Sequence, residues 1–420
     1  MNMGFPGQPG EHTLENRNIA VAVGMSTLSG MTLLLSSGAL WQGLLLHYGI
    51  SSAGVGVLIS AASIVQALAM FCNIYFSDRF RQPIRAMTMC SLPSVAFFLV
   101  MAVLCFTGKS AFSLPLLLFL VVTYNFFYGL RGIIEYKIPF LIYPMKHYGR
   151  VTAVTGISTN VLTTLVSMGI PALLQLSGYD RGMCILFIIG VCMAAGTTVL
   201  NGILRPLPDA PATEQTQAPP LSQLLKEKSF RALALPDFLR GISMGIVSSI
   251  ALIAAHSYNS DSTQLSLLVS VGTVASILGN VLFTLLGKQQ RVKDLCLISS
   301  IGLFVLGAGM IFPKRWTVFL ALYLLLQICR TIIDGTIPVM VAQFIRYQII
   351  GGYTSLRLMI TTTGSALSSA AVGFLIDRAD PASPLPTIVL LLTAGVSQLY
   401  TGSVYFRYVK KEGLNRYGKS

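Results

Sequence analysis

Residues 124–139 read YNFFYGLRGIIEYKIP, and residues 323–338, which lie 199 positions later, read YLLLQICRTIIDGTIP. The two stretches share six of their sixteen residues, and Glu135 of the first falls on Asp334 of the second. Shared apolar composition alone would give only about one or two identities. The repeat therefore predicts a chain built from two related halves, and it singles out charges placed inside hydrophobic runs.

The composition of the chain is that of a membrane protein. Its 420 residues are 54% hydrophobic and 10% charged, with a mean hydropathy of +0.71, whereas soluble domains carry about 25% charged residues. Its apolar runs reach the roughly 20 residues that cross about 30 Å of hydrocarbon, and they are continuous rather than alternating, which favours helices over a β-barrel. We expect an all-α membrane protein with twelve transmembrane helices. The expected spans are 22–46, 53–76, 86–107, 113–138, 150–176, 183–204, 236–257, 264–286, 294–312, 316–340, 354–376 and 386–407.

The positions of the charges behind the net charge of +14 indicate the orientation of the chain in the membrane. If the N-terminus is cytoplasmic, most lysines and arginines fall in the inner connections, as the positive-inside rule requires. The first seventeen residues lack the cationic region of a cleavable signal, so the first span is expected to be retained. These observations predict a multi-pass protein of the bacterial cytoplasmic (inner) membrane with both termini in the cytoplasm, and they argue against nucleic acid as a partner.

A single composition break divides the chain. The polar, proline-rich segment 205–231 is expected to be a cytoplasmic linker between an N-terminal six-helix bundle, 1–204, and a C-terminal six-helix bundle, 232–420. Two such pseudo-symmetric bundles, related by an axis along the membrane normal, would place a solute site between them near the midplane. We expect the protein to act as a monomer.

Twelve spans arranged as six plus six, a long central loop and a D-R pair after the second span together resemble the major facilitator superfamily. The family's loop pattern is G-x-L-A-D-R-x-G-R-R, and this chain keeps Asp78 and Arg79 of it. The resemblance implies a secondary active transporter that moves a small organic solute by alternating access, as a symporter or antiporter and not as an enzyme. The positions that depart from the pattern are Ile74, Arg81, Gln82 and Pro83.

Each copy of the repeat forms a stripe on one helix face. Tyr124, Arg131 and Glu135 are spaced i, i+7 and i+11, so they fall within about 40° of one another around a helix. A charge at the bilayer centre costs about 2.5–3.5 kcal/mol, so these side chains should face the protein interior and find partners. One reading is a structural i,i+4 ion pair within each helix; the other is a role at the interface between the halves. The equivalent stripe of the second half is Tyr323, Arg330 and Asp334.

The interface reading leads to a gate. In the family that this chain resembles, the helices in these positions close the cytoplasmic side. Crossed pairs of Arg131 with Asp334 and of Arg330 with Glu135 would then form an inner gate that breaks when the site opens inward. Only these two acids lie clearly within the expected spans, and the loss of an arginine partner would favour their protonation. The sequence therefore suggests protons as the coupling ion.

Further polar residues near the middle of the spans are candidate solute contacts, although each is also a candidate for a helix–helix hydrogen bond. In the loop after the second span, Asp78 and Arg79 are expected either to form a solvated turn or to latch onto the start of span 11 near Arg357. Trp41, Gln42, His47 and His256 lie toward the outer span ends, where interfacial anchoring is expected. The candidate solute contacts are Gln66, Tyr124, Asn125, Asn160, Thr163, Tyr323, Gln327, Thr361 and Thr362.

Several functions find no support in the motifs. The sequence has no phosphate-binding loop, no cluster with metal-ligand spacing and no nucleophile elbow, so we expect no cofactor and no metal. The alternatives that stay open are a transport-inactive relative acting as a membrane sensor or assembly partner, and a drug-efflux antiporter. The efflux reading has only Gly169-Ile170-Pro171 as a partial match to the antiporter pattern of span 5.

Overall fold

The structure is a computed structural model that describes residues 9–76, 82–108, 112–143, 148–207, 221–258, 262–286, 291–313, 315–342, 350–380 and 383–417. Within these residues all regular secondary structure is helical. Eleven helices are long and apolar enough to cross a membrane, or twelve if one bent pair counts as a single span. The expected all-α membrane architecture is confirmed.

The helices fall into two runs of the chain. The first run contains α1 (Pro9–Ser36), α2 (Gly38–His47), α3 (Ser52–Phe76), α4 (Pro83–Thr107), α5 (Leu114–Lys137), α6 (Pro139–Ile142), α7 (Tyr148–Ser177) and α8 (Tyr179–Ile203). The second contains α9 (Leu221–Lys226), α10 (Lys228–Ser248), α11 (Ile250–Tyr258), α12 (Ser262–Leu286), α13 (Val292–Gly309), α14 (Trp316–Ala342), α15 (Ile350–Arg378) and α16 (Leu385–Tyr417).

The first span of each half is a broken helix, which the sequence did not indicate. In the first half the break lies at Ser37 and Gly38. The φ angle of Gly38 is 71°, a conformation that glycine adopts without strain. In the second half α10 and α11 meet at Ser249 with a bend of 46°. Both spans also begin earlier than expected, at Pro9 and Lys228, because charged residues near the membrane surface continue the helix.

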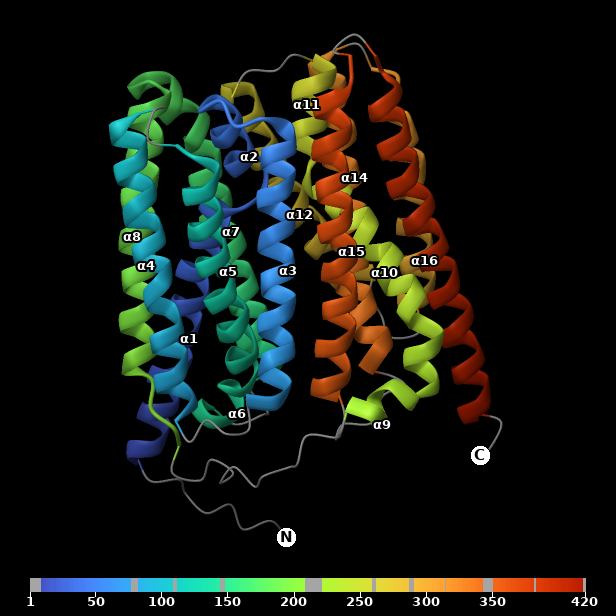
Figure 1. The fold of residues 1–420 in the computed structure, drawn as a ribbon. Helices are drawn as coiled ribbons and strands as arrows, with labels where there is room; N and C mark the ends of the chain where they lie inside the picture. The colour runs from blue at the N-terminus through green and yellow to red at the C-terminus, as the bar shows by residue number, and fades with distance from the viewer. Residues whose placement is uncertain are drawn as a thin grey trace.

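The two ends of the bundle differ in what they carry. The start of α1 and the end of α16 lie at one end, together with the short helices α6 and α9, whereas α2 and α11 lie at the opposite end (Figure 1). We call these the terminal end and the far end. The long helices run between the two ends, so each has one tip at either face of a membrane.

The two halves touch through symmetry-related helix pairs. The second span of each half packs on the fifth span of the other, as α3 with α15 and α12 with α7, and α2 also packs on α11 and α12 at the far end. At the α3–α15 crossing, a Cβ added to Gly56 would lie 2.9 Å from Gly373 Cα, so the two backbones touch. By contrast, α5 and α14 form no extensive contact in the described part of the chain. The halves are therefore joined through these helix pairs, whereas the two helices that carry the charged stripes form no extensive contact with each other among the described residues.

Candidate functional site

The stripe of the first half is held by helix α1. The Arg131 Nη2 donates to Ser29 Oγ at 3.0 Å, and its Nε lies 3.6 Å from Glu135 Oε2. The arginine side chain is only 4% exposed, and its Nε has no hydrogen-bond partner among the described residues. About two turns closer to the far end, the Tyr124 hydroxyl lies 3.0 Å from Ser36 Oγ. Arg131 of this stripe thus contacts one serine and one acid, and Tyr124 contacts a serine.

The stripe of the second half has an additional cation. Arg330 Nη2 donates to Ser248 Oγ at 3.3 Å, and its Nε lies 3.9 Å from Asp334 Oδ2. The other oxygen of Asp334 accepts a 2.6 Å hydrogen bond from Nη2 of Arg240, which comes from α10. Asp334 is 38% exposed, against 23% for Arg330 and 11% for Arg240. Two guanidinium groups therefore share one carboxylate.

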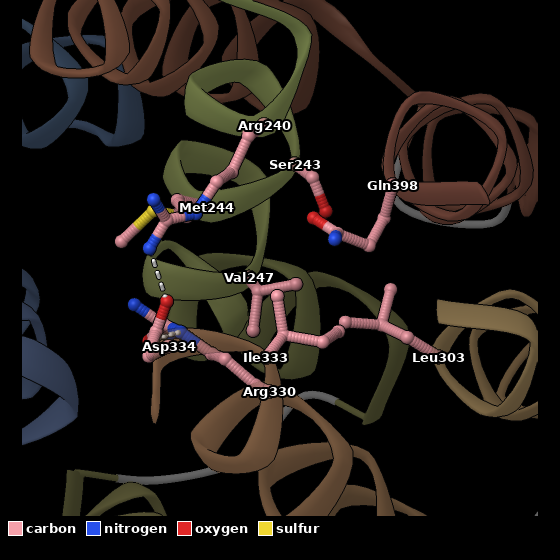
Figure 2. Close-up of a pocket in the computed structure, with 9 residues that line it drawn as sticks. All are labelled: Arg240, Ser243, Met244, Val247, Leu303, Arg330, Ile333, Asp334 and Gln398. Carbon is pink, nitrogen blue, oxygen red and sulfur yellow. Dashed lines mark hydrogen bonds and ion pairs between the residues drawn. The ribbon is translucent and has the colours of Figure 1, made fainter. Parts of the chain in front are cut away.

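These groups line a small pocket inside the second half. Figure 2 shows the guanidinium groups of Arg240 and Arg330 reaching toward Asp334, while Ser243 and Gln398 meet on the other side of the pocket. The remaining wall of the pocket is apolar. The apolar lining residues are Met244, Val247, Leu303 and Ile333.

The pairing in the structure bears on the two readings of the stripes. Each arginine is paired with the acid four residues along its own helix, at 3.6 Å and 3.9 Å. The crossed pairs of Arg131 with Asp334 and of Arg330 with Glu135 are not formed among the described ion pairs, because α5 and α14 form no extensive contact in that part of the chain. The crossed gate stays a prediction for a conformation in which those two helices meet.

A second group of charges is buried completely within the second half. Asp237 of α10 accepts from Arg357 Nε of α15 at 2.5 Å and from the Tyr405 hydroxyl of α16 at 2.6 Å. Arg357 also donates to Asp237 Oδ1 at 2.6 Å and to Tyr405. A bidentate, hydrogen-bonded pair of this kind satisfies both ions. The sequence suggested that the loop residues Asp78 and Arg79 latch near Arg357. Arg357 instead pairs with Asp237 and Tyr405 of its own half, and Asp78 and Arg79 lie outside the described residues.

Two of these charged residues escaped sequence reasoning. Asp237 was placed at the edge of the expected span 236–257, but α10 begins at Lys228, so Asp237 lies well inside a helix and is fully buried. The expectation of only two acids within the spans is therefore wrong. Arg240 stands three residues later, and it drew no notice because the first half has no arginine at the matching place. The available signal was an acid and a base three positions apart in an apolar run.

Most of the candidate solute contacts already have a local partner. Gln327 Nε2 donates to the Tyr323 hydroxyl at 2.7 Å, and Asn125 Nδ2 donates to a backbone carbonyl one turn earlier. Gln66 and Asn160 are half-buried. Their role as solute contacts stays a prediction. The threonines whose hydroxyls also donate one turn back are Thr163, Thr361 and Thr362.

The expected interfacial anchors divide into two groups. Trp41 and Gln42 are 4% and 2% exposed, so the expectation of interfacial anchoring is wrong for both. Trp41 packs on Phe97, and Gln42 Nε2 donates across the halves to the Ser248 carbonyl at 2.6 Å. His47 and His256 end or nearly end α2 and α11 at the far end. In the described part of the chain, no group of three His, Cys, Asp or Glu residues is arranged to hold a metal.

Comparison with solved structures identifies the fold. A variant of the nucleoside transporter NupG superposes with a TM-score of 0.70 at 14% identity, covering 93% of this chain and 98% of its own. A D-xylose-proton symporter gives 0.68 at 14% identity, covering 93% and 97%. A bacterial homologue of the human lysosomal transporter Spinster, in an inward-facing and unoccupied conformation, gives 0.63 at 11% identity, covering 96% and 98%. No protein-family profile and no curated protein matches the sequence. The chain has the fold of the major facilitator transporters, with two pseudo-symmetric six-helix bundles.

Proposed function

We propose that the chain is a secondary active transporter of the major facilitator superfamily that moves a small organic solute across the cytoplasmic membrane by alternating access. The proposal starts from the fold, and its main support is the pattern of contacts between the two halves. The halves join through α3 with α15 and α7 with α12, and at the far end also through α2 with α11 and α12, whereas the charge-bearing α5 and α14 form no extensive contact in the described part of the chain. A two-bundle protein closed at one end and open at the other is one state of an alternating-access cycle.

The direction of opening follows from the charges at the two ends. Most exposed arginines and lysines next to the described helices lie at the terminal end, which the positive-inside rule assigns to the cytoplasm. Under this proposal the terminal end faces the cytoplasm, both termini are cytoplasmic, and the state described above is inward-open. The described basic residues of the terminal end include Arg17, Arg85, Arg205, Lys226, Lys228, Arg231, Arg291, Lys293, Arg407, Lys410 and Lys411.

The second state of the cycle would bring α5 and α14 together. Glu135 and Asp334 are both about one-third exposed, so both carboxylates are free to exchange their within-helix partner for an arginine of the other half. The crossed pairs would then hold the terminal end closed. The proton coupling suggested by the sequence would act through these two acids during this exchange of partners.

The test is solute uptake into vesicles containing the purified protein. Uptake should respond to an imposed pH gradient, and the dependence should vanish in a Glu135→Gln, Asp334→Asn double variant that still exchanges solute. Uptake that follows sodium or a counter-solute but ignores the pH gradient would remove the proton coupling and leave the transport function. A protein that binds solutes and moves none of them would instead be a transport-inactive sensor or assembly partner.

The gate itself has a separate test. Arg131→Glu should abolish uptake by placing three carboxylates around the gate, and adding Asp334→Arg should restore it by recreating a crossed pair of reversed sign. Recovery in the double variant would support the crossed pairing. Restoration by a reversal within one helix only, Arg131→Glu with Glu135→Arg, would point to a structural pair and remove the gate.

A further inference from the structure

The ion pairs of the two stripes and of the buried Asp237–Arg357 cluster contain unequal numbers of positive and negative charges. They contain four arginines, namely Arg131, Arg240, Arg330 and Arg357, but only three carboxylates, on Glu135, Asp237 and Asp334. Asp237 is saturated by Arg357 and Tyr405. One positive charge among these described pairs therefore has no counter-ion, in a region of low polarity where an unpaired charge strongly attracts an anion.

The surplus charge is located at Arg330. Asp334 forms its short contact, 2.6 Å, with Arg240, which leaves Arg330 at 3.9 Å from the same carboxylate. A guanidinium has five N–H donors, yet in the described part of the chain Arg330 makes one long hydrogen bond, to Ser248 Oγ at 3.3 Å. Its side chain is 23% exposed, so a solute can reach it. Arg240 has a spare donor as well, because its buried Nε lacks a partner among the described residues.

From these contacts we propose that the solute is a small organic anion with a single carboxylate, and that this carboxylate binds between Arg330 and Arg240 beside Asp334. The inference rests on the proposed function, because it names the substrate class of the same site. The planar fork of a guanidinium matches the two oxygens of a carboxylate. The pocket is small and its lining residues all come from the second half, so we place only the charged group of the solute in it (Figure 2).

Charge also selects among anions. One bound carboxylate would bring these interior charges to neutrality, whereas a phosphate monoester carries about 1.5 to 2 negative charges at neutral pH and would leave an excess of negative charge. A neutral solute would leave Arg330 without a counter-ion. The site should therefore prefer a monocarboxylate to both a neutral analogue and a phosphate ester.

The experiment measures binding to the purified protein by thermal shift and titration, using acids and their uncharged amides as matched probes. The pairs are lactate with lactamide, benzoate with benzamide, and nicotinate with nicotinamide; glycerol phosphate serves as the phosphate probe. A charge-assisted bidentate contact should make the best-binding acid about tenfold or more tighter than its amide. Equal binding of acid and amide, tighter binding of the phosphate, or no carboxylate binding across the panel would overturn the proposal.

Three variants locate the effect. Arg330→Gln should bring acid and amide within about twofold of each other, and Arg330→Lys should keep only part of the preference because the fork is lost. Arg315→Gln, an exposed change at the residue that precedes the same helix, is the matched control for net charge and should keep the full preference. If Arg330→Gln does not fold, Arg240→Leu provides the second test, since it releases Asp334 to neutralise Arg330 and should abolish the preference. An unchanged acid preference in Arg330→Gln or Arg240→Leu would place the anion elsewhere and overturn the assignment.

Binding and transport fail separately in this design. A carboxylate that binds through Arg330 but never crosses a vesicle membrane would contradict the transporter function and leave the anion site intact. Uptake of neutral solutes that is unchanged in Arg330→Gln would support the transporter function and contradict the anion site.

Discussion

The two halves use one repeated stripe in different electrostatic surroundings. In the first half Arg131 faces one acid and one serine, and the neighbouring helix α1 adds no charge to the group. In the second half Arg330 competes with Arg240 of α10 for Asp334. The difference shows that the duplicated residues supply the scaffold, whereas the single-copy residues of α10 set the charge of the site.

When the breaks in the first span of each half are aligned, the residues that differ in charge between the halves can be named. When Ser37 is placed on Ser249, Arg240 falls on Leu28 and Asp237 falls on Met25. The first half is thus apolar at both positions where the second half is charged. A solute between the halves would meet an asymmetric surface, with its polar anchor on the second half.

The largest effect is expected from the charged cluster that only the second half has. Asp237→Asn should lower stability by about 3–5 kcal/mol, because it leaves Arg357 buried without its counter-ion. Asp237→Asn combined with Arg357→Met, which makes the site as uncharged as its counterpart, should recover most of the loss. Thermal unfolding of the purified variants measures both. Equal stability of the single and double variants would show that the pair is not the source of the effect.

A smaller difference is expected between the two stripes. Asp334→Asn removes the carboxylate that pairs with both Arg240 and Arg330 among the described residues, whereas Glu135→Gln removes the partner of Arg131 alone. Asp334→Asn should therefore cost about 1–3 kcal/mol more than Glu135→Gln, with the larger loss of solute uptake. Unfolding temperatures and vesicle uptake of the two variants decide this. If the two variants behave alike, Arg240 does not distinguish the halves.

The paired interfaces between the halves offer a finer comparison. At the α3–α15 crossing, a methyl group on Gly56 would meet the Ser369 carbonyl at 2.8 Å, so Gly56→Ala should cost about 1–3 kcal/mol through overpacking. Gly169→Ala in α7 is the matched control, because its Cβ would meet nothing within 4 Å. Thermal unfolding should separate the two variants, and equal stability would mean that the crossing can widen without cost.

The smallest effect is expected at the symmetry-related α7–α12 crossing, which is polar rather than glycine-rich. Ser167 Oγ lies 2.7 Å from Thr273 Oγ1, and the Ser167 carbonyl accepts from Ser270 at 2.6 Å. Interhelical hydrogen bonds in membranes average about 0.6 kcal/mol, so Ser167→Ala should change stability only slightly. A double-mutant cycle with Thr273→Val measures the coupling. A coupling far above that average would make this crossing the main attachment between the halves.

The sequence predicted the fold because hydrophobicity over span-length windows is a local property of the chain. The stripes on α5 and α14 were found for a similar reason, since helical spacing alone places their residues on one face. Arg240 and Asp237 were missed because their importance comes from helices far away in the sequence, namely α14 for Arg240 and α15 and α16 for Asp237. The choice between within-helix and crossed pairs depends on which conformation is populated, and no residue pattern encodes that.

The two tryptophans of the chain, Trp41 and Trp316, offer an optical reporter of the cycle. Trp41 sits in α2 against Phe97, and Trp316 begins α14, where its ring stacks on Phe319 at 5.5 Å. Both indoles therefore lie at the far end, one in each half. Intrinsic fluorescence will consequently report the unsealing of that end without any attached dye: water entering there should shift the emission to longer wavelength and expose the indoles to acrylamide quenching.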